Sequence, residues 1–224
     1  MDWLNVIDLG RCEYTPALEL QKELVQRTAQ GHDKRTHLLL VEHDPPVITL
    51  GRRGGAADVK LSADELQRRG VEVVEIARGG QATWHGPGQL TAYVIARLGK
   101  NTRTLRWLID ALESAAADVL ERWGIDALSR EGTAGLWVPG ENGLPPAKIA
   151  SIGIAVERWV SYHGLALNVN PSLEGFSWIV PCGQPDGRVT SMAEQIDGEI
   201  EVADVKPRLV EAIRERIGAD SETA

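Results

Sequence analysis

The sequence has little cysteine, no long apolar run and no excess of basic residues, and each absence removes a class of protein. With only two cysteines among 224 residues, Cys12 and Cys182, the chain has no disulfide framework, so we expect free thiols in a reducing compartment. No apolar stretch approaches the roughly 20 residues that cross a bilayer, so we expect no membrane span. The 24 basic and 32 acidic side chains give a formal charge of −8, which argues against a generic nucleic-acid binder.

Three further features of the sequence indicate what class of protein this is: its amino terminus, its histidines and its length. Residues 1–8 lack the basic and apolar segments of a secretory signal, so we expect a cytoplasmic protein. The five histidines show neither HExxH spacing nor a CxxC partner, so we expect no metal site. A length of 224 residues fits one large domain, which we place at residues 1–218, with a frayed tail at 219–224.

Short apolar runs and helical patterns follow one another along the chain. The runs predict strands at 3–9, 38–41, 47–50, 71–76, 90–95, 136–138, 148–156 and 164–169. The spacing of apolar residues predicts helices at 15–30, 62–70, 105–124 and 205–217. Thr15 before Pro16 fits an N-cap, and Ser62 with Glu65 fits a capping box. Because strands come in pairs separated by single helices, we expect an α+β fold, a mixed sheet flanked by helices.

A glycine-rich segment, residues 78–89, directly follows one of the predicted strands. It contains four glycines, which allow a ligand to approach the backbone closely. The segment does not complete a GxGxxG fingerprint, and Gly99-Lys100 does not complete a phosphate loop, so no nucleotide motif supports ATP-dependent chemistry. On composition alone, a surface turn whose His85 bonds to the backbone explains the segment equally well.

Cys182 and Lys148 are candidates for chemistry. Cys182 lies between Pro181 and Gly183, flanks that suit an accessible thiol, although a small buried hydrophobe is the commoner fate of a lone cysteine. Cys12 has no chemistry-bearing neighbours and fits that structural alternative better. Lys148 opens an apolar strand, where its ammonium either extends to solvent or meets Cys182.

A lysine beside the thiol of Cys182 is sufficient to activate it. A free thiol with a pKa of about 8.5 is only about 3% thiolate at pH 7, and lowering that pKa by about 2 units makes thiolate the majority form. This shift corresponds to roughly 2.7 kcal/mol. An ammonium about 4 Å away contributes at most about 4 kcal/mol at an effective dielectric constant of about 20.

The order of four short segments resembles the lipoyl(octanoyl) transferases. The segments are the glycine-rich residues 78–89, Lys-Ile-Ala-Ser-Ile-Gly at 148–153, His-Gly-Leu-Ala-Leu-Asn at 163–168 and Pro-Cys-Gly at 181–183. A fifth segment, Glu42 to Arg52, adds to the match, which spans nearly the whole chain. These enzymes belong to the biotin/lipoate protein ligase superfamily, so the resemblance implies a single α+β catalytic acyltransferase domain on a mixed sheet.

The resemblance implies the first step of protein lipoylation. An octanoyl or lipoyl group would pass from octanoyl-acyl carrier protein to a lysine of an apo lipoyl domain, through an acyl-cysteine thioester. The implied acceptors are lipoyl domains of 2-oxoacid dehydrogenase complexes and the glycine cleavage H protein. No cofactor, metal, nucleic acid or membrane is implied.

Site residues are implied by the resemblance position by position. Cys182 aligns with the nucleophile, and Lys148 aligns with the lysine that lowers its pKa and takes a proton from the acceptor amine. His163 is a supporting candidate whose role is not separated from that of His85. The residues that align with the acyl pocket are Arg78, Gly79, Gly80, Gln81, Ala82, Thr83, Trp84, His85, Ser151, Ile152, Gly153, Gly164, Leu165 and Ala166.

Two other functions fit the same scaffold: an ATP-dependent lipoate or biotin ligase, and a non-catalytic protein that binds the carrier or the lipoyl domain. The negative net charge of the chain affects binding of the donor protein. Acyl carrier proteins are acidic, so a uniformly negative surface would repel them. We therefore expect a local basic patch, for which Arg52-Arg53 and Arg68-Arg69 are candidates. Paired charges are, however, more often only solvated surface.

Overall fold

The computed structural model describes residues 3–180 and 187–218, and within these ranges the strands form a sheet of eight and a sheet of three. The large sheet has the order β1-β2-β6-β10-β9-β8-β7, with β11 paired to β9, and the small sheet has the order β4-β3-β5. The bounds in the large sheet are β1 (Leu4–Cys12), β2 (Thr36–His43), β6 (Gln89–Ile95), β7 (Leu128–Arg130), β8 (Thr133–Val138), β9 (Ala147–Glu157), β10 (Val160–Asn168) and β11 (Arg188–Val189). Those in the small sheet are β3 (Val47–Leu50), β4 (Glu72–Glu75) and β5 (Ala82–His85). Because β1 and β2 are parallel while β2 and β6 are antiparallel, the predicted mixed sheet is confirmed.

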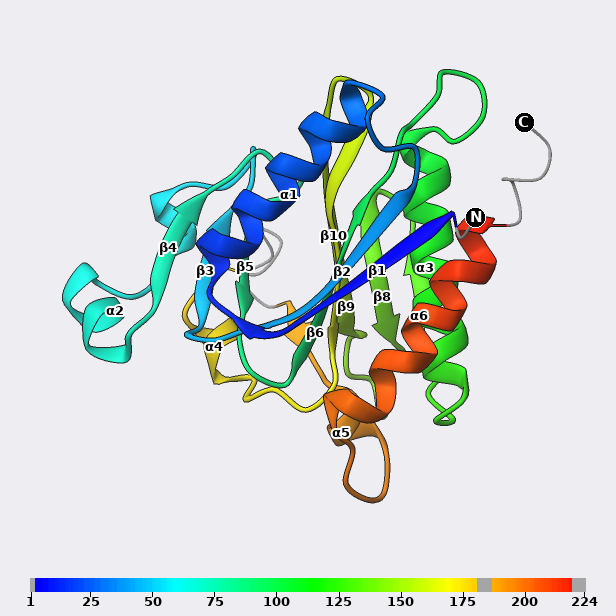
Figure 1. Cartoon of the computed structure of the whole chain (residues 1–224). Coiled ribbons are helices and arrows are strands. Elements are labelled where there is room, and N and C mark those ends of the chain that lie inside the picture. The colour runs from blue at the N-terminus through cyan, green and yellow to red at the C-terminus, as the bar shows by residue number, and fades with distance from the viewer. Residues whose placement is uncertain (1–2, 181–186, 219–224) are drawn as a thin grey trace.

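Helices cover both faces of the large sheet (Figure 1). Helices α3 (Leu105–Glu121) and α6 (Val202–Gly218) pack together on one face, and α1 (Tyr14–Ala29) crosses the other. The short helices are η1 (Ala56–Asp58), α2 (Ala63–Arg69), α4 (Glu174–Ser177) and α5 (Met192–Gln195). The α+β prediction is therefore confirmed, with the small sheet and α2 beside the main layers.

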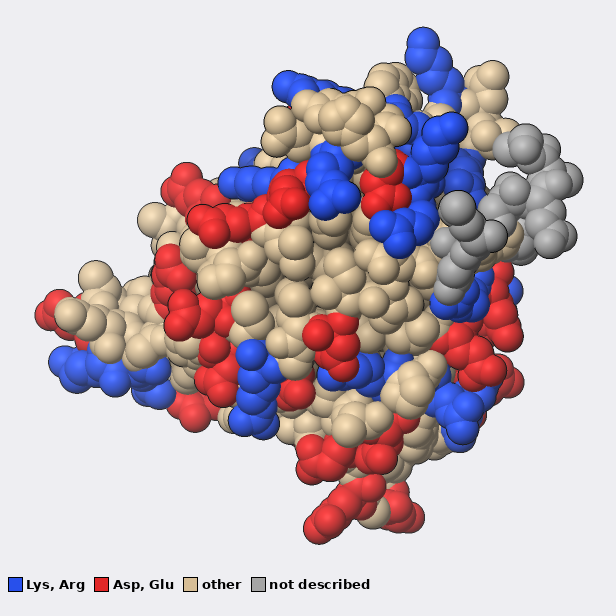
Figure 2. Space-filling model, viewed as in Figure 1, with Lys and Arg blue, Asp and Glu red and all other residues tan. Residues whose placement is uncertain are grey.

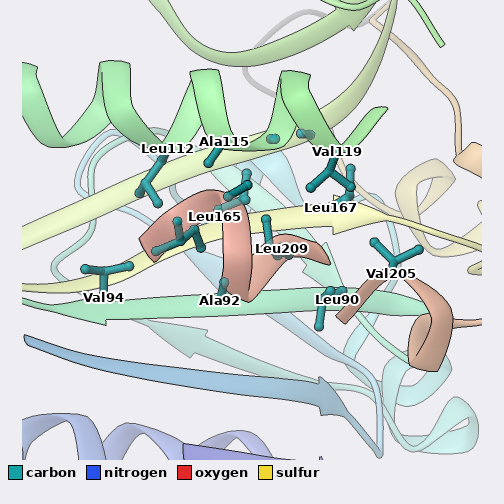
Figure 3. Packing of buried hydrophobic residues seen from close by; sticks show 14 of the residues in the cluster. Leu90, Ala92, Val94, Leu112, Ala115, Val119, Leu165, Leu167, Val205 and Leu209 are labelled. Atoms are coloured by element: carbon teal, nitrogen blue, oxygen red, sulfur yellow. The ribbon is translucent and has the colours of Figure 1, made fainter. Parts of the chain in front are cut away.

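Side chains of the central strands point alternately to the two faces of the large sheet, so each face has its own hydrophobic core. On β2, Leu38 and Leu40 point into the core under α3 and α6, while Leu39 and Val41 point into the core under α1. Successive side chains of a strand face opposite sides, so a strand covered on both faces has an unbroken apolar run. Figure 3 shows the first core, where β6 and β10 meet side chains of both helices, among them Leu112.

The small sheet has a separate core and an exposed helix. Trp84 and Ile48 pack there against Phe176 of α4. Helix α2 begins as predicted, because Ser62 Oγ accepts from the Glu65 amide while the Glu65 carboxylate accepts from the Ser62 amide.

Two sequence predictions about element boundaries are wrong. The first helix begins at Tyr14, and Glu13, not Thr15, occupies the N-cap without a side-chain hydrogen bond. Burial of the Tyr14 ring, 5.1 Å from the His43 ring centroid, fixes this start by tertiary packing. The sequence also predicts no strand within residues 78–89, whereas β5 pairs antiparallel with β3 there.

Some predictions concern residues that the structure does not describe. The nucleophile candidate Cys182 and the predicted tail at 219–224 both lie outside the described residues. Cys12 is described, and it is half-buried against the core under α1, in line with a structural role. Within the described ranges no helix is long and apolar enough to cross a membrane.

Candidate active site

A cavity of about 310 Å³ lies where the large sheet, the small sheet and the glycine-rich segment meet. Sheet pairing brings its walls together, because Ser151 on β9 is opposite Ala166 on β10, and Gly153 is opposite Gly164. Fifteen of the residues predicted for the site line this cavity: Arg78, Gly79, Gly80, Gln81, Ala82, Thr83, His85, Lys148, Ser151, Ile152, Gly153, His163, Gly164, Leu165 and Ala166.

Trp84 is the described exception among the predicted site residues. It does not line the cavity, and its ring packs 5.4 Å from the Phe176 ring in the core of the small sheet. Because side chains alternate along β5, Thr83 and His85 face the cavity while Trp84 faces away. The prediction of Trp84 as a pocket residue is corrected by this alternation.

Several cavity residues were not predicted from the sequence. Tyr14, Thr91 and Tyr93 line the same space, and the polar atoms Tyr14 Oη, Thr91 Oγ1 and His163 Nε2 have no hydrogen-bond partner among the described residues. The period-two pattern of β6 contains a signal for two of them, because Thr91 and Tyr93 share the face opposite Leu90 and Ala92. No sequence pattern marks Tyr14 as a cavity residue, because tertiary packing brings its side chain there.

Arg78 fixes the start of the glycine-rich segment. Its guanidinium is buried and donates to Thr49 O at 2.6 Å, to Thr49 Oγ1 at 2.9 Å and to Gly79 O at 3.0 Å. These bonds join the segment to β3 of the small sheet. The Arg78 side chain also explains why residue 153 is a glycine, because a Cβ atom there would lie 2.9 Å from Arg78 Cδ.

Two histidines near the cavity are oriented by hydrogen bonds. His43 Nδ1 donates to Cys12 O at 3.2 Å, so its Nε2 accepts from the Tyr93 hydroxyl at 2.7 Å. His85 Nδ1 donates to Gln89 Oε1 at 2.6 Å, which leaves Nε2 as a lone-pair nitrogen. Burial lowers the pKa of His43 to about 4 and that of His85 well below its ordinary value. Both rings are therefore neutral near pH 7.

His163 is held in an unusual backbone conformation at the cavity wall. Its φ of 60° lies in the left-handed region, and its amide donates to Gln21 Oε1 of α1 at 2.9 Å. Burial, followed by the charge of Arg78, lowers the pKa of His163 to about 3. A neutral imidazole at this place can bond a ligand but cannot supply positive charge near pH 7.

Lys148 is buried in the wall of the cavity and does not extend into solvent. Only 8% of its surface is exposed, and its ammonium lies 4.6 Å from the ring centroid of Trp137, its neighbour across β8 and β9. The backbone of β9 is fixed there by the Thr190 amide, which donates to Lys148 O at 3.0 Å. A buried ammonium facing a ligand cavity favours an anionic or nucleophilic partner.

The site has no recognisable metal-binding group in the ranges 3–180 and 187–218, where no three His, Cys, Asp or Glu side chains gather suitably. What it offers instead is a cavity with a buried cation, neutral imidazoles and glycine-lined walls. Such a site can hold an apolar chain and stabilise negative charge beside it.

Comparison with known proteins identifies the family. The family model described as the lipoyl protein ligase A/B catalytic domain matches residues 13–214. The chain belongs to this lipoyl protein ligase family. A protein named octanoyltransferase from Caldicellulosiruptor saccharolyticus is 40% identical over 96% of this chain and 89% of its own length. One of the same name from Desulfotalea psychrophila is 38% identical over 95% of this chain and 93% of its own length.

Solved structures confirm the fold of the lipoyl protein ligase family. A bipartite lipoate protein ligase from Thermoplasma acidophilum, studied with its E2 lipoyl domain, has a TM-score of 0.71 at 18% identity, covering 96% of this chain and 83% of that chain. Biotin protein ligase from Aquifex aeolicus, in complex with biotin and ATP, has a TM-score of 0.56 at 15% identity, covering 98% of this chain and 73% of that chain. The predicted relation to biotin and lipoate ligases is confirmed for the fold, and the octanoyltransferase relatives support acyl transfer within the family.

Proposed function

We propose that this protein is an octanoyltransferase that moves an octanoyl group from acyl carrier protein to a lysine of an apo lipoyl domain. The observation that carries the proposal is the burial of Lys148 in the wall of a cavity of about 310 Å³, the size range of small-molecule pockets. Identity of about 40% to octanoyltransferases over nearly the whole chain supports it. The acyl chain lies in this cavity, with its carbonyl carbon toward Lys148.

The reaction proceeds in two transfers through Cys182. The Cys182 thiolate attacks the thioester carbonyl, a new carbon-sulfur bond forms as the bond to the donor sulfur breaks, and the donor sulfur takes a proton from the Lys148 ammonium and leaves as a thiol. The lysine amine of the acceptor then attacks the acyl-cysteine, and the cysteine leaves as a thiolate. Lys148, a neutral amine after giving up its proton in the first transfer, takes the proton of the incoming amine, and the restored ammonium stabilises the Cys182 thiolate.

The donor and acceptor proteins follow from this chemistry. The donor is octanoyl-acyl carrier protein, and the acceptors are lipoyl domains of 2-oxoacid dehydrogenase complexes and the glycine cleavage H protein. A fold neighbour that was studied with an E2 lipoyl domain supports the acceptor class. The catalytic domain comprises residues 1–218. We place the protein in the cytoplasm, together with its proposed donor and acceptor proteins.

The experiment that tests the function is transfer without ATP. Purified protein, octanoyl-acyl carrier protein and an apo lipoyl domain are mixed without nucleotide, and the intact mass of the lipoyl domain is measured. We expect one octanoyl group per lipoyl domain, because a thioester is already activated for amide formation. Loading only from free octanoate with ATP would show a ligase instead, and binding of both partners without loading would show a non-catalytic protein.

A further inference from the structure

A second, smaller cavity of about 80 Å³ adjoins the first at Lys148. The two cavities share the residues Ala82, Thr83, Thr133, Lys148 and Ser151 in their walls. Lys148 therefore lies between two spaces. In the proposed reaction the acyl chain occupies the larger cavity, so the smaller cavity is open to another part of the donor.

The smaller cavity differs from the larger one in its outer wall. Two arginines, Arg130 of β7 and Arg188 of β11, line it together with Pro145 and Trp137, and both arginines are exposed. Apart from Lys148, which both cavities share, the larger cavity has its cations from other segments of the chain, namely Arg53 and Arg78. This second space thus has a lysine at its inner end and two guanidinium groups at its outer wall.

Both arginines are held by neighbours in this wall. The Arg130 guanidinium lies 5.7 Å from the Trp137 ring centroid, and the same ring lies beside the Lys148 ammonium at 4.6 Å. Arg188 Nη1 donates to Pro145 O at 2.8 Å, and the β11 backbone pairs with β9 next to Lys148. A guanidinium has five N–H donors in a planar fork, so one such bond leaves donors for a ligand.

The geometry matches the chemistry of the donor's prosthetic arm. Phosphopantetheine carries the thioester at one end and a phosphodiester at the other. With the thioester carbon at Lys148 and the acyl chain in the larger cavity, the arm needs a second path. Arginine binds phosphate oxygens with short, charge-assisted and often bidentate hydrogen bonds.

We infer that the smaller cavity is the path of the phosphopantetheine arm, and that Arg130 and Arg188 bind its phosphodiester. This site rests on the proposed octanoyl transfer and adds to it a determinant of donor recognition. It also places positive charge for an acidic carrier beside the reacting thioester, in a chain with a formal charge of −8. On the face viewed in Figure 2, acidic side chains gather around the loop that follows α5.

The test compares two small donors that differ only in the phosphate. Octanoyl-phosphopantetheine and octanoyl-pantetheine are each given to the wild-type protein and to the Arg130→Ala/Arg188→Ala variant, and the rate of enzyme acylation is followed by intact mass. We expect kcat/KM of the wild type to be about tenfold or more higher for the phosphorylated donor. In the double variant we expect this ratio to fall close to one.

A matched variant removes the same charge elsewhere. Arg122→Ala/Arg208→Ala takes away two exposed arginines that both pair with Glu211 and do not line the smaller cavity, and should keep the wild-type ratio. A wild-type ratio near one, or an unchanged ratio in the Arg130/Arg188 variant, would overturn the phosphate site while leaving octanoyl transfer standing. If neither small donor nor octanoyl-acyl carrier protein acylates the wild type, the proposed function itself fails.

A competition measurement needs no variant and remains informative if the double variant does not fold. Free phosphopantetheine and free pantetheine are compared as inhibitors of acylation of the wild-type protein by octanoyl-acyl carrier protein. We expect the phosphorylated compound to inhibit at about tenfold lower concentration. Equal inhibition by the two would contradict the assignment.

Discussion

At the scale of single residues, the site depends on a cation that the fold keeps from solvent. Lys148 contacts the Trp137 ring and lines both cavities. Its strand position alone predicts either an exposed or a buried ammonium. In the structure the Lys148 side chain is buried, because β8 and β11 pair with β9 on the two sides of this residue.

Replacing Lys148 tests its role toward the thiol. With Lys148→Met, which keeps much of the apolar volume, we expect acylation by octanoyl-acyl carrier protein at pH 7 to slow by about 25-fold, because losing a shift of about 2 pKa units lowers the thiolate fraction from about three quarters to about 3%. Alkylation of Cys182 by iodoacetamide, followed against pH, should move to higher pH in the variant. The same alkylation profile in both proteins would contradict activation by this lysine.

The buried histidines predict how stability changes with pH. The pKa of His43 is about 4 in the folded protein, below its ordinary value of 6.5. The unfolded chain therefore binds more protons between these two values, so the stabilisation is complete above about pH 6.5 and is lost as the pH falls toward 4. We expect His43 to account for a loss on the order of 2 kcal/mol by pH 5 in urea unfolding.

A variant without this titration isolates the contribution of His43. His43→Gln can still bond Tyr93 and the Cys12 carbonyl. We expect it to be less stable at pH 7.5 but to lose less stability on going to pH 5. An unchanged difference between the two pH values would show that His43 is not the buried neutral group described above.

At the scale of elements, close approach of β8 and β9 sets the position of Lys148 in the cavity wall. Gly135 on β8 has a φ of +128° and lies against the Ala150 carbonyl, and a Cβ atom there would lie 2.9 Å from Lys148 Cε. A side chain at this position would separate the strands or displace the lysine. Glu113 of α3 fixes the same glycine, since its carboxylate accepts from the Gly135 amide at 2.9 Å.

The variant Gly135→Ala tests this close approach. We expect it to lower the free energy of unfolding by about 1–3 kcal/mol and to slow acylation of the enzyme, because the lysine moves. Gly143→Ala is the matched control, since Gly143 also has a positive φ of 80° but a Cβ atom there would meet nothing within 4 Å, so it should cost only backbone strain. Equal acylation rates in the two variants would contradict the role of Gly135.

Most elements were predictable from the sequence because their signals are local. The capping box of α2 and the apolar runs of β2 and β9 depend on neighbouring residues alone. The strand β5 was not predictable, because its pairing with β3 is a tertiary contact and glycines surround it. For the same reason Trp84 was assigned to the pocket as part of a segment, whereas strand alternation turns its side chain away.

At the scale of the whole molecule, charge and docking are linked. Of the two candidate basic pairs, Arg69 is engaged with Glu174 at 3.0 Å and with the Trp178 ring at 4.9 Å. Arg53 lines the larger cavity, next to Arg52, and both are exposed. The Arg52-Arg53 pair is therefore better placed than Arg68-Arg69 to meet an acidic carrier at the site.

Charge reversal tests this docking surface. We expect Arg52→Glu/Arg53→Glu to lower kcat/KM for octanoyl-acyl carrier protein by about tenfold at low salt and to flatten its salt dependence, since exposed charges are screened within about 10 Å at 0.1 M. Arg122→Glu/Arg208→Glu serves as the control for net charge. If the Arg52/Arg53 variant keeps the wild-type rate and salt dependence, the pair does not dock the carrier.

The measurement that tests the central claim most directly is the intact mass of the protein after incubation with octanoyl-acyl carrier protein alone. We predict an adduct of one octanoyl group, located on Cys182 by peptide mapping, absent in Cys182→Ala and discharged when an apo lipoyl domain is added. No adduct in the wild type, or an adduct that persists in Cys182→Ala, would contradict transfer through this cysteine.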